Sequence, residues 1–389
     1  MRLDKSDLKD LLRGATATLL LVLGFSAAPS AAQTREIPSK KAALTVETLA
    51  SGLKKPWSVE VLPDGGYLVS EKGGTLRIVR NGEVSAPVSG VPEVATNGQG
   101  GLLDLALAPD FAASRMLYFT YSARGDGGSG TAVAKARLSE DGTKLEDATR
   151  IFLMSRLTTR GQHFGSRIAV APDGSLFFGI GDRGEGGRAQ DPRDHAGAIL
   201  HINPDGSPAA DNPFRGTSDG LAEIWSKGHR NPQGLAIDPK DGTLLSVEHG
   251  ARGGDEINNP QPGRNYGWPL VSYGRHYSGA EFELGSSARD YEPPLYYWDP
   301  SIAPGAIAVY RGPMFPEWDG NLIVAALKYQ LVARLERDDS GAVLSEERLF
   351  AGEFGRIRDV VVAPDGALLL LTDEADGALL RVARSTVVD

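Results

Sequence analysis

The chain has 389 residues, of which 41% are hydrophobic, and a formal charge of −9. This acidic balance argues against nucleic acid as the main partner, because phosphate binding needs a basic face. The chain has no cysteine, which excludes disulfides, thiolate metal sites and thiol nucleophiles.

The N-terminal residues have the pattern of an export signal. A basic leader precedes a short apolar stretch (19–25, LLLVLGF) and small residues suited to cleavage (30–32, SAA). The apolar stretch is too short for a good membrane span, so we expect no stable membrane insertion after cleavage. We predict a signal peptide over residues 1–32, a flexible segment over residues 33–43, and a periplasmic or secreted location.

One pattern recurs six times after the leader. An apolar run leads into a turn that contains Pro and Asp, and a second apolar run follows. Pro sets φ in such a turn, and Gly, where present, supplies a positive φ. The turns lie at residues 62–65, 108–110, 171–174, 238–242, 315–320 and 363–366.

Hairpins repeated at intervals of roughly 45 to 75 residues are typical of a β-propeller, and six copies predict six blades. A β-sandwich or another barrel with common turns is the alternative. We expect an all-β, six-bladed propeller over residues 44–385. Residues 44–49 (LTVETL) would close the ring by pairing with residues 379–382 (LLRV).

Polar strings beside the strands are the candidate site residues, because propellers bind ligands near the central axis on loops between blades. His163 lies between two glycines at the start of a predicted strand. It is either a general base or a loop histidine without a function. Arg230 and Asn231 stand in GHRNPQG, where the guanidinium could bind a ligand oxygen or a neighbouring carboxylate. Gln99 is a further amide cushioned by glycines.

Three cations are candidates for an anion site. Arg356 and Arg358 are two residues apart, so in extended backbone they point to the same face. They would hold an anion, or form a solvated pair helped by Asp359. Lys328 ends a long apolar run and could simply extend its amine into water.

The loop from Glu248 to Asn258 combines carboxylates with backbone carbonyls next to glycines. Calcium prefers such oxygen ligands. The EF-hand spacing is absent, so the sequence makes calcium binding plausible and no more.

Several of these strings together resemble one family. They are GHRNPQGLA, the pair DEIN (255–258) and GRNYGWP (263–269), and RIRD (356–359). The chain is similar over residues 49–382 to soluble quinoprotein sugar dehydrogenases that use pyrroloquinoline quinone (PQQ), in particular the aldose sugar dehydrogenases of the glucose/sorbosone dehydrogenase family. The resemblance implies a six-bladed propeller, in agreement with the repeat.

The resemblance also implies a role for individual residues. His163 matches the general base, Asp182 the carboxylate that orients it, and Arg230 the cation beside the reacting atoms. The positions that match cofactor contacts are Gln99, Arg230, Asn231, Ser301 (with neighbouring Trp298), Lys328, Arg356 and Arg358. The positions that match calcium ligands are the carbonyls of Gly250 and Ala251 and, at a further site, Glu256 and Tyr266.

The implied reaction is oxidation of an aldose at its anomeric hydroxyl to the lactone, with PQQ and calcium as cofactors and electrons passing to an external acceptor. Gln162 stands where glucose-specific members have an acidic residue, which favours a broad range of aldoses. Several loops are shorter than in those members, which argues against a dimer formed by the same loops and favours a monomer. A calcium-dependent propeller lactonase and a non-catalytic binding propeller are the alternative functions.

Overall fold

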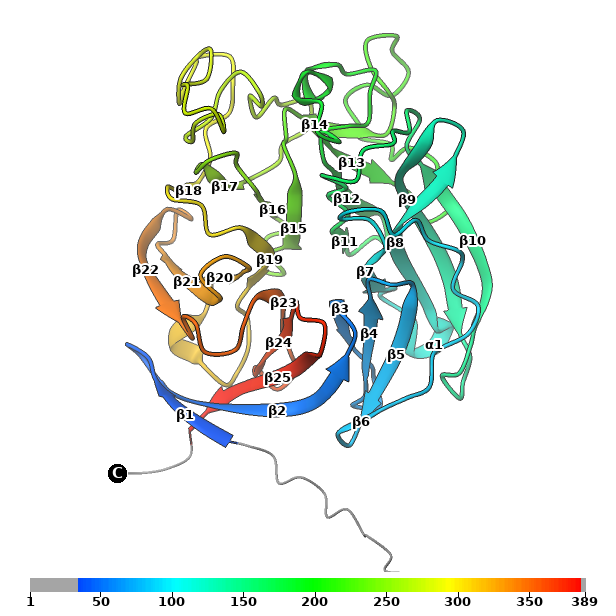
Figure 1. Cartoon of the computed structure of the whole chain (residues 1–389), viewed down its shortest axis with the longest axis vertical. Coiled ribbons are helices and arrows are strands. Elements are labelled where there is room, and N and C mark those ends of the chain that lie inside the picture. Colours follow the sequence, from blue (N-terminus) through cyan, green and yellow to red (C-terminus); the bar gives the residue numbers. More distant parts are fainter. Residues whose placement is uncertain (1–33, 386–389) are drawn as a thin grey trace, which may run out of the picture. The chain divides into compact units, whose positions relative to one another are not determined.

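The computed structural model describes residues 34–385, so the expected signal peptide lies outside the described residues. These residues form six sheets whose neighbouring strands are antiparallel, and the sheets surround a common centre like blades (Figure 1). The prediction of a six-bladed propeller is confirmed. Short helical turns are α1 (Phe111–Ser114), η1 (Gly186–Gln190) and η2 (Pro316–Trp318).

Each blade begins with its innermost strand. The first blade contains β3 (Pro56–Val61), β4 (Tyr67–Glu71), β5 (Thr75–Arg80) and β6 (Glu83–Val84). The second contains β7 (Leu102–Leu107), β8 (Met116–Gly125), β9 (Gly128–Leu138) and β10 (Leu145–Leu153). The third contains β11 (Ile168–Val170), β12 (Leu176–Ile180), β13 (Ala198–Ile202) and β14 (Ile224–Lys227). The fourth contains β15 (Pro232–Ile237), β16 (Leu244–Glu248), β17 (Asp255–Asn258) and β18 (Tyr296–Trp298). The fifth contains β19 (Pro304–Val309), β20 (Leu322–Ala326), β21 (Leu331–Arg337) and β22 (Val343–Leu349). The sixth contains β23 (Ile357–Val362), β24 (Leu368–Thr372), β25 (Gly377–Arg384), β2 (Ala43–Leu53) and β1 (Thr34–Pro38).

The six predicted turns each connect the first and second strands of a blade. In three of them a glycine with positive φ (Gly65, Gly174 and Gly366) donates its N–H back to the carbonyl three residues earlier, at 2.8–2.9 Å. This is the left-handed geometry that glycine adopts without steric cost. The turn chemistry therefore predicts the number of blades correctly.

The ring closes as predicted, because β2 pairs with β25 and brings Val46 opposite Val382. One expectation for this region differs from the structure. Residues 34–38, within the segment expected to be flexible, form β1 and pair with β2 (Figure 1). Ile37 is buried in a core cluster with residues of β23 to β25, and its burial gives this segment a reason to be ordered.

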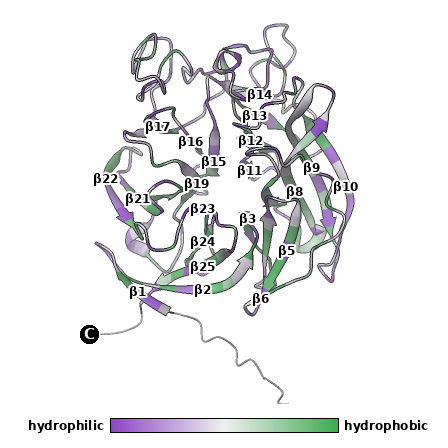
Figure 2. Ribbon diagram, viewed as in Figure 1, coloured by the Kyte–Doolittle hydropathy of each residue, from purple (hydrophilic) through white to green (hydrophobic). Residues whose placement is uncertain are grey.

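Apolar side chains fill the spaces between neighbouring blades. One cluster joins the blade of β3 to that of β7, and another joins the blade of β19 to that of β23. Hydrophobic residues gather on the strands, whereas the long connections between β13 and β14 and between β17 and β18 carry mostly hydrophilic or neutral residues (Figure 2). The blades thus form a rigid scaffold, and the loops are available for binding.

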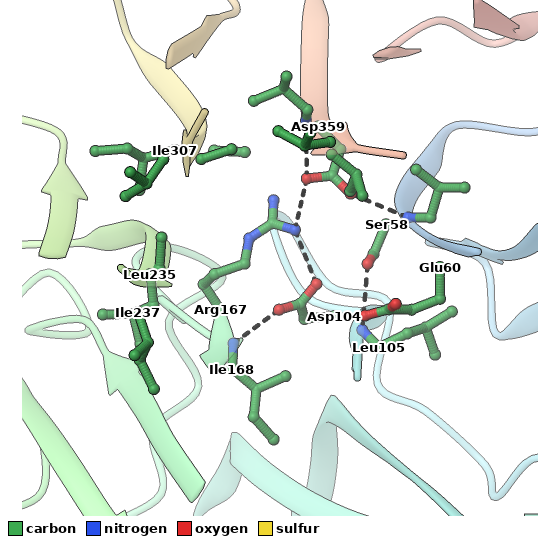
Figure 3. Close-up of a pocket in the computed structure, with 18 residues that line it drawn as sticks. Ser58, Glu60, Asp104, Leu105, Arg167, Ile168, Leu235, Ile237, Ile307 and Asp359 are labelled. Atoms are coloured by element: carbon green, nitrogen blue, oxygen red, sulfur yellow. Dashed lines mark hydrogen bonds and ion pairs between the residues drawn. The ribbon is translucent and has the colours of Figure 1, made fainter. Parts of the chain in front are cut away.

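The innermost strands line a central channel that contains a cavity of about 370 Å³. Arg167 reaches into it and pairs with Asp104 at 2.8 Å and Asp359 at 2.9 Å (Figure 3). Glu60 lines the same cavity. Burial, and after it the carboxylates of Asp104 and Asp359, raises the pKa of Glu60 to about 8.

We expect Glu60→Gln to reduce the loss of stability at alkaline pH. Between pH 4.5 and 8 the native state keeps a proton on Glu60 that the unfolded chain releases, so ionisation costs the native protein stability as the pH rises. One pKa unit corresponds to about 1.4 kcal/mol, and we expect the variant to gain about 1–3 kcal/mol over wild type between pH 5 and pH 9. Urea unfolding at both pH values measures this difference. Glu83→Gln, at an exposed position, is the control; an equal change in both variants would contradict the assignment.

Candidate active site

A second cavity, of about 220 Å³, lies among the loops at one end of the blades. Neighbouring strands are antiparallel, so the start of each innermost strand and the end of the next strand lie at the same end of a blade. Four of the predicted residues line the cavity: Gln99, Asn231, Arg356 and Arg358. Six polar or aromatic residues that the sequence did not single out line it too: Trp57, Lys72, Phe164, Gln233, His249 and Asp373.

The cationic side of the cavity is built around Asp373. Arg358 donates to its Oδ2 at 2.8 Å and Arg356 at 3.4 Å. Burial alone would raise the pKa of Asp373, but the two guanidinium groups hold it below its ordinary value. The alternative in which Asp359 helps a solvated pair of Arg356 and Arg358 is wrong, because Asp359 turns to the channel and pairs with Arg167.

Arg358 also has an unused donor. Its side chain is 11% exposed, and its Nη1 donates to Gln233 Oε1 at 3.0 Å. Its buried Nε finds no hydrogen-bond partner within residues 34–385. A buried unpaired donor is costly, so this atom is a natural contact for an anionic ligand in the cavity.

Lys328 and Ser301 are outside the lining of this cavity. Leu327 lines it, whereas the Lys328 amine lies 5.1 Å from the ring centre of Tyr329. Ser301 donates its hydroxyl to Asp255 at 2.6 Å. The additional cation in the cavity is Lys72, whose amine donates to the Gly98 carbonyl at 2.7 Å.

His163 and Asp182 form a hydrogen-bonded pair next to the cavity. His163 Nδ1 lies 2.6 Å from Asp182 Oδ1, and the backbone N–H of His163 donates to Gln99 Oε1 at 2.7 Å. His163 has φ 53°, a left-handed backbone that is uncommon for a residue other than glycine. Burial would raise the pKa of Asp182, but the hydrogen bond and charge of His163, with donors from Gly184 and Trp268, lower it.

Arg230 is buried on the other side of this pair. Its carbonyl accepts the N–H of Asp182 at 2.8 Å, and its own N–H donates to Glu248 at 2.5 Å. Its guanidinium donates to the His249 carbonyl at 3.3 Å and to the Tyr277 hydroxyl at 3.2 Å. The buried Nε lacks a hydrogen-bond partner in the described part of the chain, so Arg230 too has a donor to offer.

Three of the four predicted metal residues, Gly250, Glu256 and Tyr266, line a third and much smaller cavity of about 10 Å³ together with Glu248. Ala251 lies outside its lining. Burial, and then the neighbouring Glu248 carboxylate, raises the pKa of Glu256 well above its ordinary value. The carboxylate of Glu256 receives one weak hydrogen bond, from Asn258 at 3.4 Å.

The arrangement around Glu256 is not a ready-made cluster of ligands. Within residues 34–385, no group of three His, Asp or Glu side chains stands ready to hold a metal ion. The Tyr266 hydroxyl is taken up by the Asn259 carbonyl and the Gln261 N–H. A cation here would therefore depend on Glu256, Glu248 and backbone carbonyls.

The sequence does contain a signal for the residues that were missed. Lys72, His249 and Asp373 each follow directly after the second strand of a blade, as do Gly181 and Leu327. Gln233 stands in GHRNPQG itself. A rule that collects the residue after each second apolar run would have found Lys72, His249 and Asp373.

The family model for glucose/sorbosone dehydrogenases matches residues 53–381. The chain belongs to this family. An aldose sugar dehydrogenase of Escherichia coli strain K12, YliI, is 43% identical over 347 residues, which cover 88% of this chain and 93% of that protein. The predicted resemblance is confirmed.

Two solved structures of related proteins agree with the fold. The soluble aldose sugar dehydrogenase of Escherichia coli, in its apo-form, is 42% identical with a TM-score of 0.85, and the match covers 88% of this chain and all of that one. The PQQ-bound aldose sugar dehydrogenase of Streptomyces coelicolor is 31% identical with a TM-score of 0.73, and the match covers 89% of this chain and all of that one. Among the described residues of this family member, no helix is long and apolar enough to cross a membrane.

Proposed function

We propose that this protein is a PQQ- and calcium-dependent dehydrogenase that oxidises aldoses at the anomeric hydroxyl to lactones and passes the electrons to an external acceptor. One observation carries the proposal. A cavity with three cations, Lys72, Arg356 and Arg358, adjoins the hydrogen-bonded pair of His163 and Asp182. A cationic pocket beside a positioned base suits a polyanionic redox cofactor and a hydroxylated substrate.

The residues present fit PQQ, which carries three carboxylates. Asp373 offsets one of the three positive charges in this cavity, so a net positive charge is left for an anionic ligand. The unpaired Nε of Arg358 supplies a charge-assisted donor of the strong kind. Arg356 and Lys72 would bind further carboxylate oxygens, while Gln99 and Asn231 offer amides.

The residues around Glu256 also fit a divalent cation. The buried Glu248 and the partly buried Glu256 lie side by side there, and Asn258 Oδ1 is buried with no partner among the described residues. A cation would relieve the repulsion between Glu248 and Glu256. We propose the carbonyls of Gly250 and Ala251 as ligands of the cofactor-bound calcium. We propose Glu256 and Tyr266 as ligands of a further calcium, with Tyr266 acting through its backbone carbonyl because its hydroxyl is already hydrogen-bonded.

When bound, PQQ supplies a quinone carbonyl carbon that accepts a hydride, and calcium polarises that carbonyl. His163 accepts the proton of the anomeric hydroxyl at Nε2, because Nδ1 faces Asp182. The C1–H bond breaks as the C1–O bond becomes a carbonyl, so the sugar loses one proton and one hydride. Arg230, buried next to Asp182, would stabilise the negative charge that develops on the oxygen.

Dye-linked oxidation of aldoses by the purified apo-protein tests this function. Activity should appear only after both PQQ and calcium are added. Turnover of lactones without PQQ would favour a calcium-dependent hydrolase instead. If PQQ binds but every aldose fails, the substrate class is wrong.

We expect calcium to stabilise the apo-protein through Glu256. A buried carboxyl with a raised pKa must lose its proton before it can bind a cation, so binding releases a proton and strengthens as the pH rises. Calcium at about 100 times its Kd should add about 2.7 kcal/mol to the free energy of unfolding. Thermal unfolding with and without calcium, at pH 6 and pH 8, measures this.

Glu256→Gln should abolish the calcium-dependent part of the stability and its pH dependence. Glu283→Gln, at an exposed glutamate in the connection between β17 and β18, is the matched control and should keep both. An unchanged response of Glu256→Gln would place the cation elsewhere.

We further propose that residues 1–32 direct export to the periplasm or the medium and are then removed. N-terminal sequencing of the secreted protein tests this. A mature N-terminus near Gln33 is the expected result.

A further inference from the structure

Trp268 lies between the two halves of the proposed catalytic machinery. Its indole Nε1 donates to Asp182 Oδ2 at 2.7 Å. The face of its ring lies 5.1 Å from the guanidinium carbon of Arg230, a cation–π distance. One side chain therefore touches both the carboxylate that holds His163 and the cation proposed to stabilise the oxyanion.

The two carboxylate oxygens of Asp182 accept hydrogen bonds from different donors. Oδ2 receives the indole N–H, while Oδ1 receives His163 Nδ1 at 2.6 Å and the Gly184 N–H at 2.6 Å. An ionised carboxylate only accepts hydrogen bonds, so Nδ1 of His163 carries the proton and Nε2 keeps its lone pair. The indole prevents the carboxylate from rotating and thereby fixes the tautomer that a base needs.

Trp268 is itself firmly held. Its backbone N–H donates to the Gly228 carbonyl at 2.9 Å, and its own carbonyl accepts from Gln190 Nε2 at 2.7 Å. Phe282 packs edge-on against the ring at 5.3 Å. At Gly186 a Cβ would lie 3.3 Å from the indole nitrogen, so glycine there leaves room for the ring. These contacts let Trp268 act as a fixed reference for both partners.

We propose that Trp268 is a positioning residue that sets the basicity and orientation of His163 through Asp182 and holds Arg230 beside them. The inference rests on the proposed function, because it assumes that His163 is the base. Loss of the indole donor would leave more negative charge on Asp182 and stabilise protonated His163. The other charged groups near the pair, Arg183, Glu185 and Arg230, would be unchanged.

Trp268→Phe tests the inference, because it keeps an aromatic ring and removes the N–H. In the apo-protein, NMR titration should give His163 a pKa about 0.5–1 unit higher than in wild type. In the loaded enzyme, the acid limb of the kcat/KM profile should move by the same amount. We expect kcat to fall about 10-fold and the Kd of PQQ to change less than about 3-fold, because misplacement of a base affects chemistry more than binding.

Trp225→Phe is the matched control. Trp225 donates its indole N–H to the Pro260 carbonyl at 2.9 Å, away from the pair, so the titration and the pH profile should stay as in wild type. A double-mutant cycle with Asp182→Asn separates positioning from simple damage. If Trp268 acts through Asp182, Trp268→Phe should shift the pKa of His163 no further in the Asp182→Asn background.

The inference is overturned if Trp268→Phe leaves both the His163 titration and the pH profile unchanged in an active enzyme. If wild type shows no PQQ-dependent turnover, the proposed function fails, while the titration in the apo-protein still tests the coupling. If Trp268→Phe does not fold, a measurement on the wild-type protein tests the inference instead. Its Trp268 indole N–H signal should follow the titration of His163, and a signal that ignores it would refute the coupling.

Discussion

Replacing His163 with alanine should lower kcat for aldose oxidation by about 10²–10⁴-fold, the usual contribution of a positioned general base. The side chain is 12% exposed, and its Nδ1 is held by Asp182, so Nε2 is the nitrogen left to receive a proton. PQQ affinity should change little, because His163 contacts the cavity through its backbone bond to Gln99 rather than through its ring. Steady-state kinetics with a dye acceptor, together with a PQQ titration, measures both quantities.

His195→Gln is the control for loss of an imidazole. His195 is also buried, but its Nδ1 accepts the N–H of Ser155, and neither residue belongs to the proposed machinery. Its kcat should stay within about 3-fold of wild type if the protein remains folded by circular dichroism. A His163→Ala enzyme with wild-type kcat would show that His163 takes no part in the reaction, whether or not its affinity for PQQ changes.

Arg358→Ala should weaken PQQ binding by about 10²-fold or more. The guanidinium is almost fully buried at the cavity, and a hydrogen bond to a charged group contributes about 1.5–3 kcal/mol. Two such bonds to one carboxylate correspond to the expected loss. Arg356, with a side chain that is 42% exposed, should matter less, and Arg356→Ala should cost about 10-fold or less. Fluorescence titration of the apo-protein with PQQ ranks the two.

Two further variants separate cofactor binding from stability. Arg358→Ala leaves Asp373 without its closest partner, so Asp373→Asn added to it should restore the thermal stability but not the affinity. Arg381→Ala removes an arginine that pairs with an aspartate, Asp365, at the opposite end of the blades. It should leave the Kd of PQQ unchanged. Equal losses for Arg381→Ala and Arg358→Ala would mean that only net charge matters.

The blades were predictable because their signals are local. A Pro and Asp turn between two apolar runs specifies a hairpin within about 20 residues, and six such hairpins require a ring. The closing pair of β2 and β25 was predictable for the same reason, since an unpaired apolar run at each terminus of the ring needs a partner. The ordering of β1 was missed, because it depends on Ile37 finding a core built by residues far along the chain.

The residues of the candidate site were predictable only where a short stretch of sequence is unusual in its polar residues. Asn231 and the two arginines at 356 and 358 were found because each stands in an unusual polar string, and all three line the cavity. Lys72, His249 and Asp373 follow ordinary strands of three different blades. No single stretch of sequence shows that these three residues meet.

The amino-acid sequence by itself determined the repeat, the ring and the family, since turn chemistry and motifs are written in neighbouring residues. Only the tertiary structure decided which charges become partners. Arg358 reaches Asp373, whereas Asp359 beside it turns to the channel and binds Arg167. The physical reason is that two different pairings act here. The hairpin of β23 and β24 brings Asp373 beside Arg358 within one blade, whereas closing the ring brings Arg167 of another blade within hydrogen-bond reach of Asp359 across the channel.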